Sequence, residues 1–121
     1  MALILVAEDT PEIASLIKDV LESRGHQVAL AADGVRMIEQ AKTLRPKLII
    51  SDIMMPGAYG SSAHKVLQGD PYTRDIPVLF VTGVAPAQAE KVVATSPKVR
   101  LLHKPIDILL LLEAVTALLG A

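Results

Sequence analysis

Residues 3–9 of the chain read Leu-Ile-Leu-Val-Ala-Glu-Asp, an uninterrupted apolar run that ends in two acids. A continuous apolar run of this length is typical of a strand covered on both faces, because a half-exposed strand would alternate apolar and polar residues. Thr10, Pro11 and Glu12 then supply an N-cap residue, a proline for the first helical position and an acid for the first turn. The stretch therefore predicts a buried strand that passes directly into a helix.

The same strand-then-helix pattern recurs along the chain. Apolar runs predict five strands, at residues 3–7, 28–31, 48–51, 78–81 and 99–102. The first helix is expected to end at Gly25, and the third has little room between Gly60 and Gly69. The fourth helix is expected to include Val92–Ala94, and the last to lie within Ile106–Leu119. Alternating strands and helices with short connections predict one α/β domain, residues 1–121, with a parallel sheet covered by helices on both faces.

The composition excludes several classes of function. Hydrophobic residues make up 51% of the 121 residues and aromatic residues only 2%, which indicates an aliphatic core. A formal net charge of -1 predicts no binding to nucleic acid or to an acidic membrane surface. The chain has no cysteine, so disulfides, thiolate metal sites and a thiol nucleophile are excluded. With no apolar stretch long enough to cross a bilayer and no basic leader, we expect a cytoplasmic protein.

Polar or charged residues lie within two residues of the ends of four of the five predicted strands. Glu8 and Asp9 follow the first, Asp52 the third, Thr82 the fourth and Lys104 the fifth. Because the carboxyl ends of parallel strands meet in one crevice, these side chains are expected to be neighbours. Taken singly, each has an ordinary structural explanation as a cap or turn residue, but the four strand ends together indicate a functional site.

The residue types at this edge favour a magnesium site and phosphoryl chemistry. Two carboxylates 4 Å apart repel by about 4 kcal/mol at an effective dielectric constant of 20. The acids Glu8, Asp9 and Asp52 should therefore bind a cation or raise a carboxyl pKa. Hard oxygen ligands without His or Cys favour Mg²⁺ or Ca²⁺, and a site with few carboxylates and several waters suits Mg²⁺ better. Asp52 is the natural nucleophile toward a phosphoryl group, and Thr82 and Lys104 could donate to its oxygens. The three histidines, His26, His64 and His103, have no metal-ligand spacing and are interpreted as structural or surface residues.

The strand-end motifs together resemble a known family. Glu8-Asp9, the stretch Asp52–Gly60 with Pro56, Thr82-Gly83 and Lys104-Pro105, in this order and spacing, resemble the receiver domain of two-component response regulators, the CheY-like family. The resemblance covers essentially the whole chain. It implies a flavodoxin-like (βα)5 fold, a three-layer sandwich with parallel strands in the order 2-1-3-4-5.

The resemblance also implies a function in a phosphorelay. Asp52 would accept a phosphoryl group from a phosphohistidine on a histidine kinase or histidine phosphotransfer protein. The residues implied to organise Mg²⁺, partly through water, are Glu8, Asp9, Asp52 and Met54, the last through its backbone carbonyl. The chain would then catalyse only its own phosphorylation and dephosphorylation and would not be an enzyme acting on an external substrate.

The resemblance assigns the remaining site residues and exposes a departure from the family. Thr82 and Lys104 would bind the phosphoryl oxygens, and the bond before Pro105 would be cis. Leu101 stands three residues before the lysine, where receiver domains usually carry the Tyr or Phe of an aromatic switch. Activation is therefore expected as ordering of Gly83–Ala87 and of the start of the next helix.

Three other classes of function compete with this interpretation. An FMN module would need a phosphate-cradling loop after the first strand, where this chain has acids and a proline. A phosphatase of the haloacid-dehalogenase type would need a second acid two residues after Asp52, where Met54 stands. The third alternative, an interaction or dimerisation module that phosphorylation does not regulate, stays open.

The last helix is apolar on almost every side. One face, expected to pack on the sheet, contains Ile108, Leu111, Leu112, Val115 and Leu119. A second stripe contains Leu110, Ala114 and Ala117. This stripe is expected on the outside, where it could form a homodimer or dock a partner, although a single exposed leucine is also common on monomers.

Overall fold

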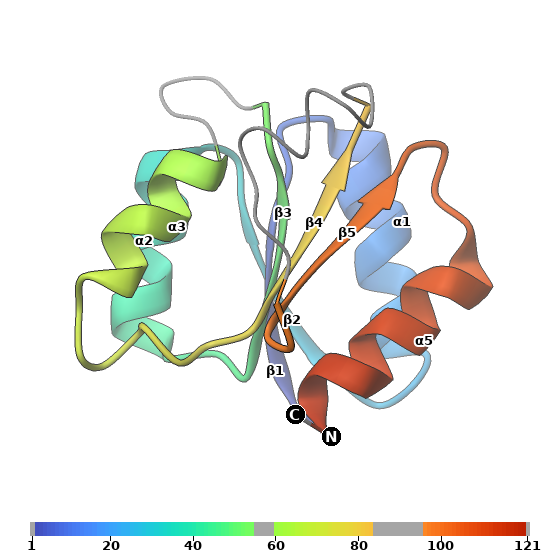
Figure 1. Ribbon diagram of the computed structural model, residues 1–121. Helices are drawn as coiled ribbons and strands as arrows, with labels where there is room; N and C mark the ends of the chain where they lie inside the picture. The colour runs from blue at the N-terminus through green and yellow to red at the C-terminus, as the bar shows by residue number, and fades with distance from the viewer. Residues whose placement is uncertain (1, 55–59, 84–95, 121) are drawn as a thin grey trace.

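A computed structural model describes residues 2–54, 60–83 and 96–120 of the chain. Its centre is a five-stranded parallel sheet with the order β2-β1-β3-β4-β5, as predicted (Figure 1). The strands are β1 (Leu3–Ala7), β2 (Gln27–Ala31), β3 (Leu48–Asp52), β4 (Val78–Thr82) and β5 (Val99–His103). All five predicted strands are confirmed, most of them one residue longer than the apolar run that predicted them.

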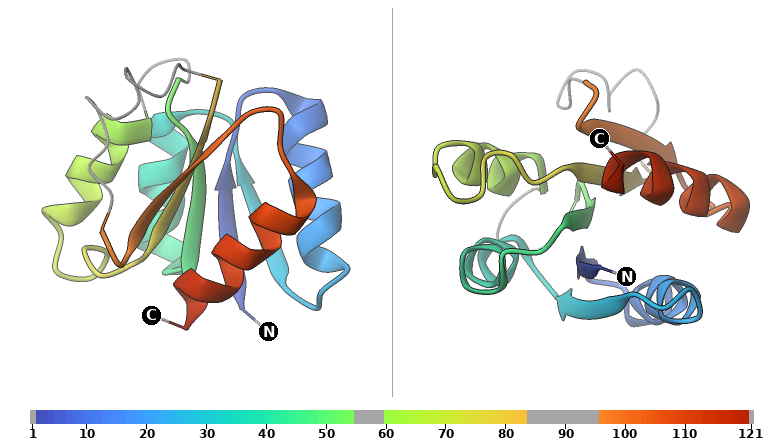
Figure 2. Two further views of the ribbon diagram at one scale, coloured as in Figure 1. Left: turned by 45° about the vertical axis from the view of Figure 1, so that its right-hand side comes forward. Right: turned by 90° about the horizontal axis from the view of Figure 1, so that it is seen from below.

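Helices cover both faces of the sheet. The described helices are α1 (Pro11–Glu22), α2 (Gly34–Leu44), α3 (Gly60–Gln68) and α5 (Ile108–Leu119). The pair α1 and α5 lies on one face and the pair α2 and α3 on the other, which gives three layers (Figures 1 and 2). The expected helix around Val92–Ala94 lies outside the described residues. None of the described helices has the length and apolarity needed to span a membrane.

The continuous apolar runs follow from this layered architecture. Successive strand residues point to opposite faces, so a strand with helices on both sides needs apolar residues at every position. In β1, Leu5 and Ala7 pack in the cluster that contains Met37 of α2, whereas Ile4 and Val6 pack in the cluster that contains Ile17 of α1. The two aliphatic cores hold the sheet in place between the helix layers. They thereby fix the position of the edge where the strands end.

The ends of α1 differ in detail from the sequence prediction. Thr10 occupies the N-cap position, but its side chain makes no capping hydrogen bond. The expected closure at Gly25 is wrong, since α1 ends at Glu22 with Ser23 as the C-cap residue. Gly25, with φ +87°, instead belongs to the turn that leads into β2. A left-handed backbone is readily adopted by glycine, which explains the residue at this turn.

The buried face of α5 also differs from the predicted one. Asp107 caps the helix by accepting hydrogen bonds from the backbone N–H groups of Leu109 and Leu110 at 2.9 and 3.2 Å, so α5 begins at Ile108, within the predicted segment Ile106–Leu119. The residues buried against the sheet are Leu111, Ala114, Val115 and Leu118. Ala114, predicted on the outside, is therefore in the core, whereas Ile108, predicted on the inside, is 43% exposed. Leu110 is exposed as predicted, at 49%.

Candidate functional site

The polar residues predicted to meet at the carboxyl edge of the sheet do so. Glu8 directly follows β1, Asp52 and Thr82 are the last residues of β3 and β4, and Lys104 directly follows β5. These four strand ends lie at the upper edge of the sheet in Figure 1. Parallel pairing with a uniform register brings residues far apart in sequence to the same height, which explains their meeting.

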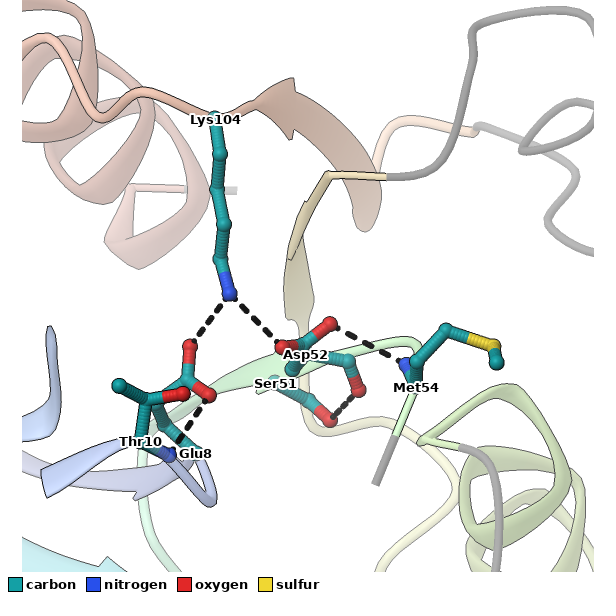
Figure 3. Close-up of polar contacts among 6 residues, drawn as sticks. All are labelled: Glu8, Thr10, Ser51, Asp52, Met54 and Lys104. Carbon is teal, nitrogen blue, oxygen red and sulfur yellow. Dashed lines mark hydrogen bonds and ion pairs between the residues drawn. The ribbon is translucent and has the colours of Figure 1, made fainter.

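Lys104 lies at the centre of the site and bridges two carboxylates (Figure 3). Its Nζ is 2.8 Å from Oδ2 of Asp52 and 2.9 Å from Oε1 of Glu8. One carboxylate oxygen from each of Glu8, Asp9 and Asp52 lies within 4.8 Å of the other two. Three acids and one ammonium group thus share a small volume and carry a formal excess of negative charge.

Backbone groups hold the second oxygen of both bridged carboxylates (Figure 3). The Met54 N–H donates to Oδ1 of Asp52 at 3.1 Å, and the Thr10 N–H donates to Oε2 of Glu8 at 3.2 Å. Each carboxylate is therefore oriented on one side by an amide and on the other by Lys104, which restricts its rotation. The sequence prediction missed both amides, because any residue except proline provides a backbone N–H.

The lysine is itself tied to the neighbouring strand. Its backbone N–H donates to the carbonyl oxygen of Thr82 at 2.7 Å, which joins the ends of β4 and β5. The peptide bond between Lys104 and Pro105 is cis, as the family resemblance implied. Thr82 is fully buried at the end of β4.

Burial governs the electrostatics of the site. Glu8 and Asp52 are buried, whereas Asp9 is exposed. Burial raises the pKa of the Glu8 carboxyl, with contributions from Asp9 and Asp52, while Lys104 and the Thr10 amide act in the opposite direction. Burial also disfavours the charge of Lys104, but its hydrogen bonds and attraction to Asp52 and Glu8 outweigh that effect and raise the pKa of the ammonium. Burial thus makes the Glu8 carboxyl costly to keep charged.

The donor set suits a hard divalent cation. The cluster offers three carboxylate oxygens and no histidine or cysteine, which is the chemistry of a Mg²⁺ site. Because Asp9 is exposed, one side of the cluster is open to water and to an incoming oxygen ligand. Met54 follows the nucleophile candidate and its side chain is 49% exposed; a role for its backbone carbonyl stays a prediction.

Leu101 occupies the position at which receiver domains usually have an aromatic residue, and it packs against the core. Leu101 pairs with Phe80 across β4 and β5 and is partly buried against the core cluster that contains Phe80. A partly buried aliphatic residue therefore packs where the family usually has its switch residue. Of the segment Gly83–Ala87, in which ordering was expected, all but Gly83 lies outside the described residues.

None of the three histidines belongs to the acidic cluster in the described part of the chain. His26 Nδ1 accepts a hydrogen bond from the Ala2 N–H at 3.2 Å, and the His64 ring packs edge-on against Phe80 with 5.6 Å between ring centroids. His103 is exposed at the end of β5. These placements agree with the structural interpretation of these residues.

Comparison with known proteins identifies the class. Residues 4–116 match the family model of the response regulator receiver domain, so the chain belongs to this family. Receiver domains are the phosphate-accepting signalling domains of two-component systems, and they bind Mg²⁺ at an acidic site. The resemblance inferred from the strand-end motifs is confirmed.

Several relatives cover the chain over nearly its full length. PilH of Pseudomonas aeruginosa is 35% identical over 121 residues, with 99% of each chain covered. The DNA-binding dual master transcriptional regulator RpaA of Synechocystis is 36% identical over 119 residues, which are 98% of this chain but 49% of RpaA. The chain thus spans about half the length of that relative.

Solved structures share the fold. The receiver domain of a Pseudomonas aeruginosa sensor histidine kinase, which has a magnesium ion coordinated in its active-site cleft, superposes with a TM-score of 0.88 at 26% identity, covering 99% of this chain and 98% of that one. The chemotaxis protein CheY4 of Vibrio cholerae has a TM-score of 0.84 at 28% identity, with 98% of each chain covered.

Proposed function

We propose that residues 1–121 act as one receiver domain in which Asp52 accepts a phosphoryl group from a phosphohistidine of a histidine kinase or histidine phosphotransfer protein. The observation that carries the proposal is the cluster of three carboxylate oxygens within 4.8 Å beside Lys104. Three carboxylates so close together repel one another unless a cation joins them, which supports a metal-assisted site over three independent caps.

The proposed chemistry gives each site residue a role, and Asp52 has two. A carboxylate oxygen of Asp52 attacks phosphorus, the bond from phosphorus to the histidine nitrogen breaks, and the imidazole keeps the electron pair and takes up a proton from water. Glu8, Asp9 and Asp52, with the Met54 carbonyl, would hold Mg²⁺, which would supply positive charge to neutralise the transferring oxygens. Lys104 and Thr82 donate to the phosphoryl oxygens of the product. The domain catalyses this self-modification and its hydrolysis and acts in the cytoplasm.

Chemical labelling tests the proposal. Wild-type protein with acetyl phosphate and Mg²⁺ is expected to form an acyl phosphate, detected by intact-mass and peptide mass spectrometry. Asp52→Asn should abolish it, and chelation of the metal should do the same. Asp75→Asn, an exposed acid at the opposite edge of the sheet, is the matched control and should be labelled normally. A wild type that stays unmodified would favour the alternative, an interaction module not regulated by phosphorylation.

We further propose that the outer face of α5 carries the output contact, as a homodimer. Leu109 and Leu110 are 73% and 49% exposed, and Arg100 and Glu113 line the grooves beside them. Neither charge is ion-paired within the described residues. In a twofold arrangement, Arg100 of one copy could pair with Glu113 of the other.

Light scattering over a concentration series tests this contact. Self-association is expected to strengthen with a beryllofluoride mimic of the phosphoryl group and to weaken in Leu110→Glu. Glu39→Gln, an exposed change on α2, serves as the control. A wild type that is monomeric in both states excludes the homodimer.

A further inference from the structure

A second concave surface lies at the opposite edge of the sheet, where the strands begin. The groove has a volume of about 690 Å³. It is built from the segments that precede β1, β3, β4 and β5 and from the end of α5. These segments lie at the lower edge of the sheet in Figure 1 and face the viewer in the right-hand view of Figure 2.

The rim of this groove is basic although the chain as a whole is slightly acidic. Arg45, Lys47 and Lys98 line it and are exposed, against the single carboxylate of Asp75. None of the three cations is ion-paired within the described ranges, and Lys98 Nζ contacts only the backbone carbonyl oxygen of Asp75, at 3.3 Å. The local formal charge is positive on a protein whose net charge is -1, so the groove attracts anionic groups.

Arg45 has a backbone conformation that arginine rarely adopts. It is the C-cap residue of α2, with φ +48° and ψ +62°, a left-handed position usually taken by Gly or Asn. Its guanidinium carbon lies 4.5 Å from the centroid of the Tyr72 ring, which is itself 70% exposed. This cation–π contact holds the guanidinium over the ring face, where its N–H groups can still donate to a carboxylate. A side chain held this way at a strained position is a candidate for a binding role.

The floor of the groove is apolar. Leu118 is buried there, and Leu119, Ile76 and Pro77 are partly buried. An anion without an apolar part would leave this floor in contact with water. The occupant that matches both features carries carboxylates for the rim and an apolar side chain for the floor. Because the rim cations are exposed rather than enclosed, the groove suits an extended segment better than a small molecule, which is normally buried over most of its surface.

We infer that this groove, defined by Arg45, Lys47, Tyr72, Lys98 and Leu119, binds an acidic peptide segment of a partner protein that inserts an apolar side chain between its carboxylates. The groove lies at the opposite edge of the sheet from Asp52. Binding there is therefore independent of the phosphoryl chemistry proposed for the other edge.

Fluorescence anisotropy with a defined probe tests the inference. The probe is a short fluorescein-labelled peptide of alternating Glu and Leu, compared with a peptide in which every Glu is replaced by Gln. Saturable binding to the full chain is expected for the acidic peptide alone. Arg45→Asn, Lys47→Gln and Lys98→Gln should each weaken it, and the triple variant should weaken it by roughly tenfold or more. Asn accepts the left-handed backbone, so Arg45→Asn keeps the end of α2 intact.

Controls separate the groove from general charge effects. Lys65→Gln removes an exposed cation of α3 that does not line the groove and should leave the affinity unchanged. Asp52→Asn should also bind the peptide normally, which distinguishes failure here from failure of the phosphorelay proposal. Undetectable binding at millimolar peptide, or equal loss in Lys65→Gln and the groove variants, would overturn the inference. Binding to vesicles containing phosphatidylserine but not to the peptide would also overturn it, in favour of a membrane surface.

Discussion

The two edges of the sheet carry charge in opposite ways. Where the strands end, Glu8 and Asp52 are buried, and Lys104 bridges them at 2.9 and 2.8 Å. Where the strands begin, Arg45 and Lys98 are exposed and have no ion pair within the described residues. Buried charges interact strongly with each other and with a metal ion, whereas exposed charges are screened by water and salt. Substitutions should therefore affect folding and chemistry at the first edge and recognition alone at the second.

The largest expected difference between the two edges is in stability, when the charge of one lysine is removed at each edge. Lys104→Gln leaves the buried carboxylates without their cation and should lower the free energy of unfolding of the metal-free protein by about 2 kcal/mol. This loss is smaller than for a fully buried pair because the Lys104 side chain is 20% exposed. Lys98→Gln should change the free energy of unfolding by less than about 0.5 kcal/mol. Urea unfolding in the presence of a chelator measures both. Equal effects of the two substitutions would contradict the contrast between the edges.

The next effect separates metal binding from stability. Asp9→Asn removes one charge from the cluster and should weaken Mg²⁺ binding by about tenfold. The metal-free fold should be as stable as wild type or more stable, since repulsion from Glu8 and Asp52 is relieved. Calorimetric Mg²⁺ titration and thermal melts with and without Mg²⁺ provide the two readouts. A clear loss of metal-free stability would instead identify Asp9 as a structural cap.

A matched substitution at the other edge should leave metal binding untouched. Asp75→Asn removes the one carboxylate of the basic groove. Mg²⁺ affinity should stay at the wild-type value, while the acidic peptide should bind about twofold to threefold more tightly because repulsion on the rim decreases. The same calorimetric and anisotropy titrations apply. Weaker peptide binding in this variant would show that Asp75 supports the groove rather than opposing the ligand.

The smallest effect is a pH dependence of stability whose sign differs between regions. The raised pKa of Glu8 means that the folded state binds a proton more readily, so the metal-free protein should lose stability as pH rises from 4.5 through that raised pKa. Burial lowers the pKa of His64, so stability should be lost as pH falls from 6.5 toward the lowered value. Glu8→Gln should remove the first component, and His64→Gln should remove the His64 share of the second, to which His26 also contributes because burial lowers its pKa. His103→Gln, at an exposed site, should remove neither.

Sequence alone predicted the strands and the site at their ends. Leu3–Ala7 and Leu48–Ser51 could be interpreted because a strand with helices on both faces must be apolar at every position. The site followed from topology, since polar residues after successive parallel strands must meet at one edge. The carboxylates and the lysine could be found because their residue types are rare beside buried strands.

Only the tertiary structure decided which face of α5 is buried and what orients the site. A helix that is apolar almost all round has no unique inner face, so its packing on the sheet selected Ala114 and Leu118 and left Ile108 partly exposed. The amides of Thr10 and Met54 carry no mark in the sequence because every residue except proline has one. The basic groove is assembled from several separate segments, and its cations become neighbours only once the chain is folded.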